Sequence, residues 1–157
     1  MIMSDPKQFD KILTEIIRQD KGIKRVILTD KTGLTIANVS KLAPFPVDTD
    51  SIGAIASAVF CASEEQGKNL QIGDLEIVTS EFSDGKIFAS ACGKGVLSVV
   101  SGAEVNIGLI RLVMKKQGKE LADELDKFLA VETSTPAKSK ELDEEGLKQA
   151  LEELEKV

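Results

Sequence analysis

Residues 48–69, DTDSIGAIASAVFCASEEQGKN, predict a helix of unusual composition at the centre of this sequence. Asp and Ser residues at its start can cap a helix. Its interior mixes small residues with the larger apolar Ile52, Ile55, Val59 and Phe60. A helix that is apolar on nearly all sides is buried on more than one side. We therefore expect one side of this helix to rest on a sheet and another side to meet a partner.

The small residues of this helix indicate what that partner is. A surface of Gly53, Ala54, Ala58 and Ala62 would let another backbone approach closely. In a chain of 157 residues, the natural candidate is a second copy of the same helix. Cover by loops of the same chain is the alternative.

Strands are predicted on both sides of this helix. Residues 23–40, IKRVILTDKTGLTIANVS, are two β-branched runs around a turn in which Gly33 supplies a positive φ. The prolines of residues 41–46, KLAPFP, exclude a helix or a strand there and predict a loop. After the helix come three further strand-like runs, LEIVTSEF, KIFASAC and GVLSVVS, which are joined by the short turns SDG and GKG.

Two amphipathic helices complete the domain. Residues 4–22 carry an apolar stripe at helical spacing that includes Phe9, Leu13 and Ile16. Residues 105–130 return to the same period. The predicted order over residues 1–130 is therefore α-β-β-α-β-β-β-α, which is an α/β (α+β) fold.

A separate acidic segment follows the domain. Residues 131–140 are a polar linker, and residues 141–157 predict a short helix with Leu147, Leu151 and Leu154 on one side. That segment contains seven acidic residues and two lysines. Gly146 lowers its intrinsic helicity, so a helix this short is marginal in isolation. It could pack on its own domain, bind a partner or fray, and docking through the three leucines is our expectation.

Composition narrows the classes of function. The formal charge of −6 argues against nucleic acid as a partner, because phosphate binding needs a basic patch. The sequence contains no His, which removes Ser-His and Cys-His pairs and the commonest metal ligand. Cys61 and Cys92 are too far apart for a C-x-x-C motif and are expected to be buried free thiols. No apolar stretch is long enough to insert in a membrane, so we expect a soluble, cytoplasmic protein. We also expect that the protein has no cofactor.

Two short motifs resemble catalytic signatures but do not fit them. ACGKGV lacks the first Gly of a phosphate-binding loop and the Ser or Thr after its Lys, so it predicts a hairpin turn. SDGK at residues 83–86 matches S-x-x-K, but it lies between two strands instead of at a helix start. Cys92 has no adjacent base in the sequence. We therefore expect no enzymatic activity.

The order of elements, the VILTDKTGLTIA hairpin, the GAIASAVFCASEE helix and VNIGLIRLVMKK after the last strand together resemble the Roadblock, or dynein light chain, family. The likeness covers residues 5–130, and the extra terminal helix is similar to that of MglB-like members. It implies a five-stranded antiparallel sheet sandwiched by helices, with the first and last helices on one face. It also implies a homodimer in which the third strands pair and the central helices lie side by side.

The resemblance further implies a function. Roadblock proteins bind Ras-like small GTPases as regulators or scaffolds, and MglB-like members are GTPase-activating without supplying an arginine. The implied dimer and partner surface consists of Ala54, Ile55, Ala58, Val59, Ala62, Leu75, Ile77 and Val78. Two other hypotheses remain open, which are a small-molecule-sensing or signalling adaptor module and a Cys- or Lys-based enzyme. The lack of Trp, Tyr and His counts against a sensory pocket.

Overall fold

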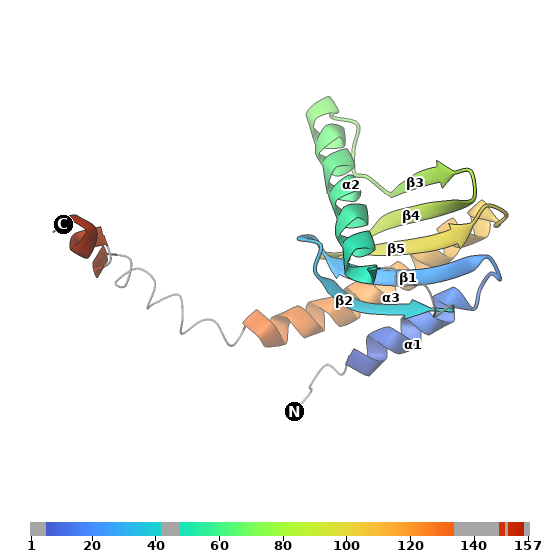
Figure 1. Ribbon diagram of the computed structural model, residues 1–157, viewed down its shortest axis with the longest axis horizontal. Helices are drawn as coiled ribbons and strands as arrows, with labels where there is room; N and C mark the ends of the chain where they lie inside the picture. Colours follow the sequence, from blue (N-terminus) through green and yellow to red (C-terminus); the bar gives the residue numbers. More distant parts are fainter. Residues whose placement is uncertain (1–5, 42–47, 134–147, 150, 156–157) are drawn as a thin grey trace.

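The computed structural model describes residues 6–41, 48–133, 148–149 and 151–155. The long helices among these residues are α1 (Pro6–Ile17), α2 (Thr49–Leu70) and α3 (Ile107–Thr133). The strands are β1 (Ile23–Asp30), β2 (Thr35–Ser40), β3 (Ile77–Phe82), β4 (Gly85–Cys92) and β5 (Gly95–Gly102). The predicted α-β-β-α-β-β-β-α order and the α/β class are confirmed (Figure 1).

The five strands form one sheet in the order β2-β1-β5-β4-β3, with every neighbouring pair antiparallel. The predicted turns hold the hairpins together. Gly33 lies between β1 and β2 at φ +95°, and Gly93 lies between β4 and β5 at φ +62°. Both values fall in the left-handed region that glycine adopts at little steric cost. The ACGKGV segment is therefore a hairpin turn.

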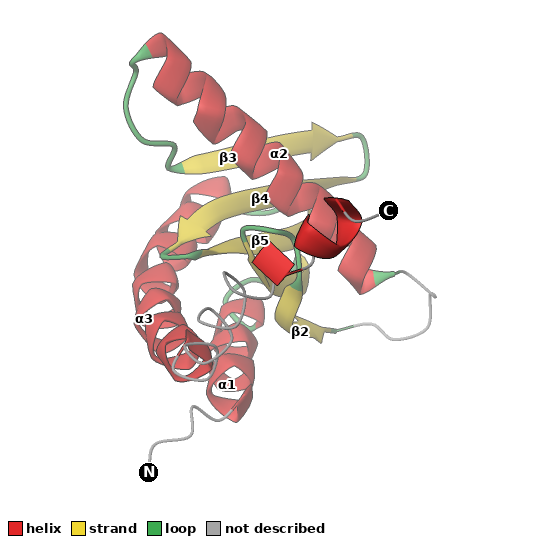
Figure 2. Ribbon diagram, turned by 90° about the vertical axis from the view of Figure 1, so that its left-hand side faces the viewer, coloured by secondary structure: helices red, strands yellow, loops and turns green. Residues whose placement is uncertain are grey.

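Helices cover both faces of the sheet. Helices α1 and α3 lie side by side on one face, and α2 crosses the other face alone (Figure 2). Phe9 of α1 meets Phe128 of α3 edge to face, with ring centroids 5.7 Å apart. This face holds the larger core, because the helices bury their apolar stripes against β1, β4 and β5.

Alternation along the strands supplies both faces with apolar side chains. In β1, Val26 and Leu28 belong to the core under α1 and α3. The intervening Ile27 and Thr29 lie beneath α2, next to Gly53. A smaller core of Phe60, Ala89 and Val96 fills the space between α2 and the sheet. Burial of Phe60 alone contributes on the order of 2 kcal/mol of hydrophobic free energy.

Both ends of α2 carry capping interactions. Asp48 precedes the helix in an extended conformation, and its carboxylate accepts a hydrogen bond from the Ser51 amide. Gln71 ends the helix in the left-handed conformation, and its amide donates to Gly67 and Lys68 carbonyls. Among the helices of the described ranges, none combines the length and apolar character needed to cross a bilayer.

Candidate functional site

The outward side of α2 carries an exposed stripe of small and apolar residues, which we call the α2 stripe. It consists of Ala54, Ile55, Ala58, Val59 and Ala62. In the single chain, Ile55 is 62% exposed and Val59 is 43% exposed. The buried side of the same helix is formed by Gly53, Ala56, Ser57, Phe60 and Gly67. The two sets interleave at helical spacing, so α2 presents one side to the sheet and an almost equally apolar side to solvent.

The α2 stripe is also uncharged. No Asp, Glu, Lys or Arg occurs from Ser51 to Ala62, although 29% of the whole sequence is charged. Twelve helical residues span about 18 Å, so the uncharged stretch extends over about three turns of the helix. Depletion of charge and exposure of apolar side chains distinguish the core of protein interfaces from ordinary surface.

A groove adjoins the α2 stripe between α2 and the outer strands β3 and β4. It has a volume of about 190 Å³ and is mainly apolar. Its lining residues are Ile52, Ile55, Ala56, Val59, Val78, Ser80, Phe82, Ile87 and Ala89. Phe82 is 59% exposed, which is unusual for so large an apolar side chain. The stripe and the groove form one continuous surface.

Strand β3 is the free edge of the sheet beside this surface. It pairs with β4 along one side, and among the described strands none pairs with its other side. Such an edge presents backbone N–H and C=O groups that another strand can bind. The expected joining strand therefore does lie at an edge.

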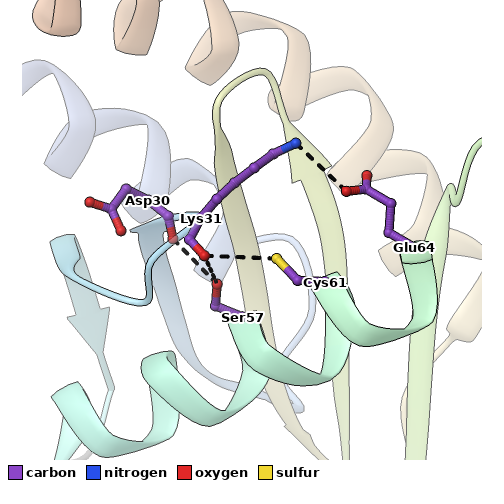
Figure 3. A network of polar contacts seen from close by, with 5 residues as sticks. All are labelled: Asp30, Lys31, Ser57, Cys61 and Glu64. Atoms are coloured by element: carbon purple, nitrogen blue, oxygen red, sulfur yellow. Dashed lines mark hydrogen bonds and ion pairs between the residues drawn. The ribbon is translucent and has the colours of Figure 1, made fainter. Parts of the chain in front are cut away.

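A polar network fixes α2 to the β1–β2 turn (Figure 3). The Ser57 hydroxyl lies 3.3 Å from the Asp30 carbonyl oxygen and 3.4 Å from that of Lys31. The Cys61 thiol donates to the same Lys31 carbonyl at 3.8 Å, and the Lys31 ammonium pairs with Glu64 at 3.8 Å. These contacts come from the inner side of the helix, so they orient α2 without using its outer stripe.

The structure brings only part of the expected interface together. Ile55, Val59 and Val78 line the same groove. Ile77 packs instead against the core on the α1 and α3 side, because successive strand residues face opposite ways. Leu75 precedes the strand, which begins two residues later than LEIVTSEF suggests, and packs near Phe60.

One residue was grouped wrongly. Gly53 does not share the surface of Ala54, Ala58 and Ala62, because it is buried against β1. A Cβ at this position would lie 2.8 Å from Cγ2 of Thr29. Gly53 therefore allows α2 to approach the sheet closely, and it does not serve contact with a second helix.

Some groove residues were not anticipated from the sequence. Ile52, Ile87 and Phe82 line the groove together with Val78. Alternation places Val78 and Phe82 on one face of β3, but only the register with β4 brings Ile87 beside them.

The tail positions are described in part. Leu151 and Leu154 are 56% and 74% exposed. Leu147 lies outside the described residues.

The two thiols have different environments. Cys61 is half-buried, which corrects the expectation that both are buried. Cys92 is buried and donates to the Gly118 carbonyl at 3.3 Å. Burial, and secondarily the charge of Asp126, raises the pKa of Cys92 from 9.0 to about 12. This group is therefore a protonated packing residue at neutral pH, unlike a nucleophile, whose pKa is lowered.

Comparison with known proteins places this chain in a family. The Roadblock/LC7 domain matches residues 9–101, from α1 to β5, which is more than half of the chain. The chain belongs to the Roadblock/LC7 family. The uncharacterized protein MJ1340 of Methanocaldococcus jannaschii is 38% identical over 112 residues, which cover 71% of this chain and 95% of that protein. Members of this Roadblock family are generally non-enzymatic regulators.

Solved structures share the Roadblock fold. MglB of Myxococcus xanthus matches with a TM-score of 0.71 at 20% identity, covering 82% of this chain and 95% of that one. A structure described as MglB with a tetrameric arrangement matches with a TM-score of 0.72 at 18% identity, covering 82% and 96%. These matches confirm the predicted sandwich of helices around a five-stranded antiparallel sheet. The family match supports a regulator or adaptor module.

Proposed function

We propose that this Roadblock protein is a non-enzymatic homodimer that binds a Ras-like small GTPase as a regulator or scaffold. The observation that carries the proposal is the α2 stripe, an uncharged apolar helix face that is exposed in the single chain. Because only 62% of Ile55 and 43% of Val59 are still exposed, burying the remainder would contribute roughly 1–2 kcal/mol for each side chain. A second copy of the same helix would cover this surface in a symmetric, isologous contact.

In the proposed dimer, two β3 edges pair and two α2 helices lie side by side. Pairing of β3 with its counterpart would cover the free edge and extend the sheet across both protomers. Ala54, Ala58 and Ala62 recur every four residues, so one small row follows the helix. Small side chains along such a row allow helix axes to approach closely. The MglB structure with a tetrameric arrangement supports self-association of this fold.

The paired helices would then form the platform for the GTPase, as the family suggests. The described arginines do not favour a transferred catalytic arginine. Arg25 lies within β1 and donates to the Thr49 hydroxyl at 3.2 Å. Arg18, directly after α1, and Arg111, on α3, lie across the sheet from α2. Any GTPase-activating effect would therefore act by positioning the residues of the GTPase itself, in contrast to an inserted arginine. We place the protein in the cytoplasm, where such GTPases act.

Two measurements on the full chain test this proposal. Sedimentation velocity over a range of concentrations should give a dimer mass. The immobilised protein, incubated with host lysate and either a GTP analogue or GDP, should retain a Ras-like GTPase in a nucleotide-dependent manner, and the retained protein should then bind when purified. A monomer at all concentrations would contradict the dimer, and absence of any GTPase in both nucleotide states would contradict the partner.

A further inference from the structure

We propose that the acidic C-terminal segment, residues 141–157, docks into a groove on the face of the sheet opposite α2. This groove lies between α3 and the β3–β4 side of the sheet and has a volume of about 540 Å³. Its lining residues on the sheet side are Leu75, Glu76, Ile77, Ser90, Ala91 and Gly93. We call it the α3 groove.

The α3 groove is basic in a protein that is acidic overall. Arg111, Lys115 and Lys119 line it from α3, whereas Glu76 is its sole acidic lining residue. The three cations recur every four residues, which places them along one side of α3 over about 12 Å. Within the described residues none of these three cations has an ion pair, whereas Lys127, farther along α3, pairs with Glu124. A row of unpaired cations beside an apolar floor suits an amphipathic acidic segment.

The lining of the α3 groove contains an exposed apolar side chain and a buried hydroxyl without a hydrogen-bond partner. Leu112 is 64% exposed at its side. The Ser90 hydroxyl is buried and has no hydrogen-bond partner among the described residues. A buried hydroxyl without a partner costs free energy, so this wall of the groove is incompletely satisfied among the described residues.

The C-terminal segment has the complementary chemistry. It combines seven acidic residues with leucines at helical spacing. Helical backbone is present at Leu151–Glu155, where Leu151 and Leu154 are exposed. Glu155 lies one turn after Leu151, so an acidic side chain borders the apolar side of this turn. Leucines could cover Leu112 and the groove floor while carboxylates approach the cations of α3.

The connecting chain is long enough for docking within one molecule. From Arg111 to the end of α3 at Thr133 there are 22 helical steps, or about 33 Å. The seven residues 134–140 can span at most about 23–25 Å, and Lys119 lies 14 helical steps, or about 21 Å, from Thr133. The segment can therefore begin beside Lys119 and continue along α3 toward Arg111.

Hydrogen exchange of the full chain tests the contact. At low salt, we expect amides of residues 151–155 to exchange at least about tenfold more slowly than in a Lys115→Glu/Lys119→Glu variant, and high salt should remove the difference. The control is Lys116→Glu/Lys127→Glu, which makes the same charge change on α3 outside the groove lining. Adding Glu152→Lys and Glu153→Lys to the groove variant should restore slow exchange. Equal exchange in the wild type and the groove variant would overturn the proposal and leave the groove to an external ligand.

Cross-linking tests whether the contact lies within one chain. A full-length Cys61→Ser/Leu112→Cys/Leu151→Cys variant should form an internally cross-linked monomer with a short bismaleimide. The remaining thiol, Cys92, is buried. A covalent dimer as the main product would assign the groove to the segment of a second copy and overturn docking within the same chain.

Discussion

Gly53 of α2 lies so close to Thr29 of β1 that a Cβ at Gly53 would be only 2.8 Å from the Thr29 Cγ2 atom. The same added atom would lie 3.2 Å from Cγ2 of Ile27. This close approach seats the N-terminal half of α2 on the sheet. It also determines which side of the helix is left for a partner.

A matched pair of substitutions measures this contact. Gly53→Ala and Gly118→Ala both gain about 1 kcal/mol of helix propensity. A Cβ at Gly118 would meet nothing closer than the Ala91 carbonyl oxygen at 4.0 Å. Overpacking should therefore make the Gly53 variant less stable than the Gly118 variant by about 1–3 kcal/mol in urea unfolding. Equal free energies of unfolding would show that α2 can shift away from β1 without cost.

Substitution of two phenylalanines should distinguish residues that stabilise the fold from residues that stabilise the dimer. Phe60 of α2 is buried against the sheet, whereas Phe82 of β3 is 59% exposed. We expect Phe60→Ala to lower the free energy of unfolding by about 3–5 kcal/mol. Phe82→Ala should change the stability of the monomer by less than about 1 kcal/mol and weaken dimerisation, measured by sedimentation equilibrium. Unchanged dimerisation in the Phe82 variant would remove the groove from the interface.

The α2 stripe predicts the effect of a single large cation. Ala58→Arg introduces a charge at the centre of the uncharged face and should convert the dimer to a folded monomer, because a buried unpaired charge is costly. Ala58 is exposed in the single chain, so far-UV circular dichroism should not change. Ala103→Arg, at an exposed position after β5, is the matched control and should remain dimeric. If the Ala58 variant also stays dimeric, the dimer uses another surface.

The burial of Cys92 predicts that its thiol reacts slowly with thiol reagents in the folded protein. With a pKa of about 12 in place of 9.0, Cys92 holds about a thousandfold less thiolate at pH 8 than an ordinary thiol. In a Cys61→Ser variant, we expect almost no reaction with a disulfide reagent until denaturant is added. Rapid reaction of the native variant would mean that α3 opens readily over β4.

The same thiol predicts a dependence of stability on pH. Its pKa is raised in the folded state, so its contribution is present below the unfolded pKa and is lost as pH rises from about 9 toward 12. Between pH 8 and pH 10.5, the wild type should therefore lose more unfolding free energy than Cys92→Ala. All other residues are the same in the two proteins, so their contributions cancel in this comparison. Parallel losses would place the thiol in a more polar environment.

Local patterns in the sequence were enough to predict the elements, apart from the loop expected at residues 41–46, of which residues 42–46 lie outside the described residues. Alternation of apolar residues and the glycine turns each act over a few residues. They predicted every strand and helix of the domain within a few residues of its observed bounds. The row of Ala54, Ala58 and Ala62 was visible for the same reason, since its spacing follows from the helical period alone.

Contacts between distant segments could not be predicted in this way. Helical spacing alone does not say which side of an all-apolar helix faces the sheet, so Gly53 was assigned to the wrong side. Strand alternation needs the register with β4 to decide that Val78 lines the groove with Ile87 while Ile77 points to the other face.

The sequence by itself determined the order of elements, the uncharged small-residue helix and the acidic C-terminal segment, because these depend on neighbours along the chain. The tertiary structure decided the rest. It made β3 the free edge beside the α2 stripe, and it placed three cations of α3 around a groove next to the unpaired Ser90 hydroxyl. Both surfaces arise where segments far apart in sequence pack together, and packing of that kind is determined by the whole sheet and not by any local pattern.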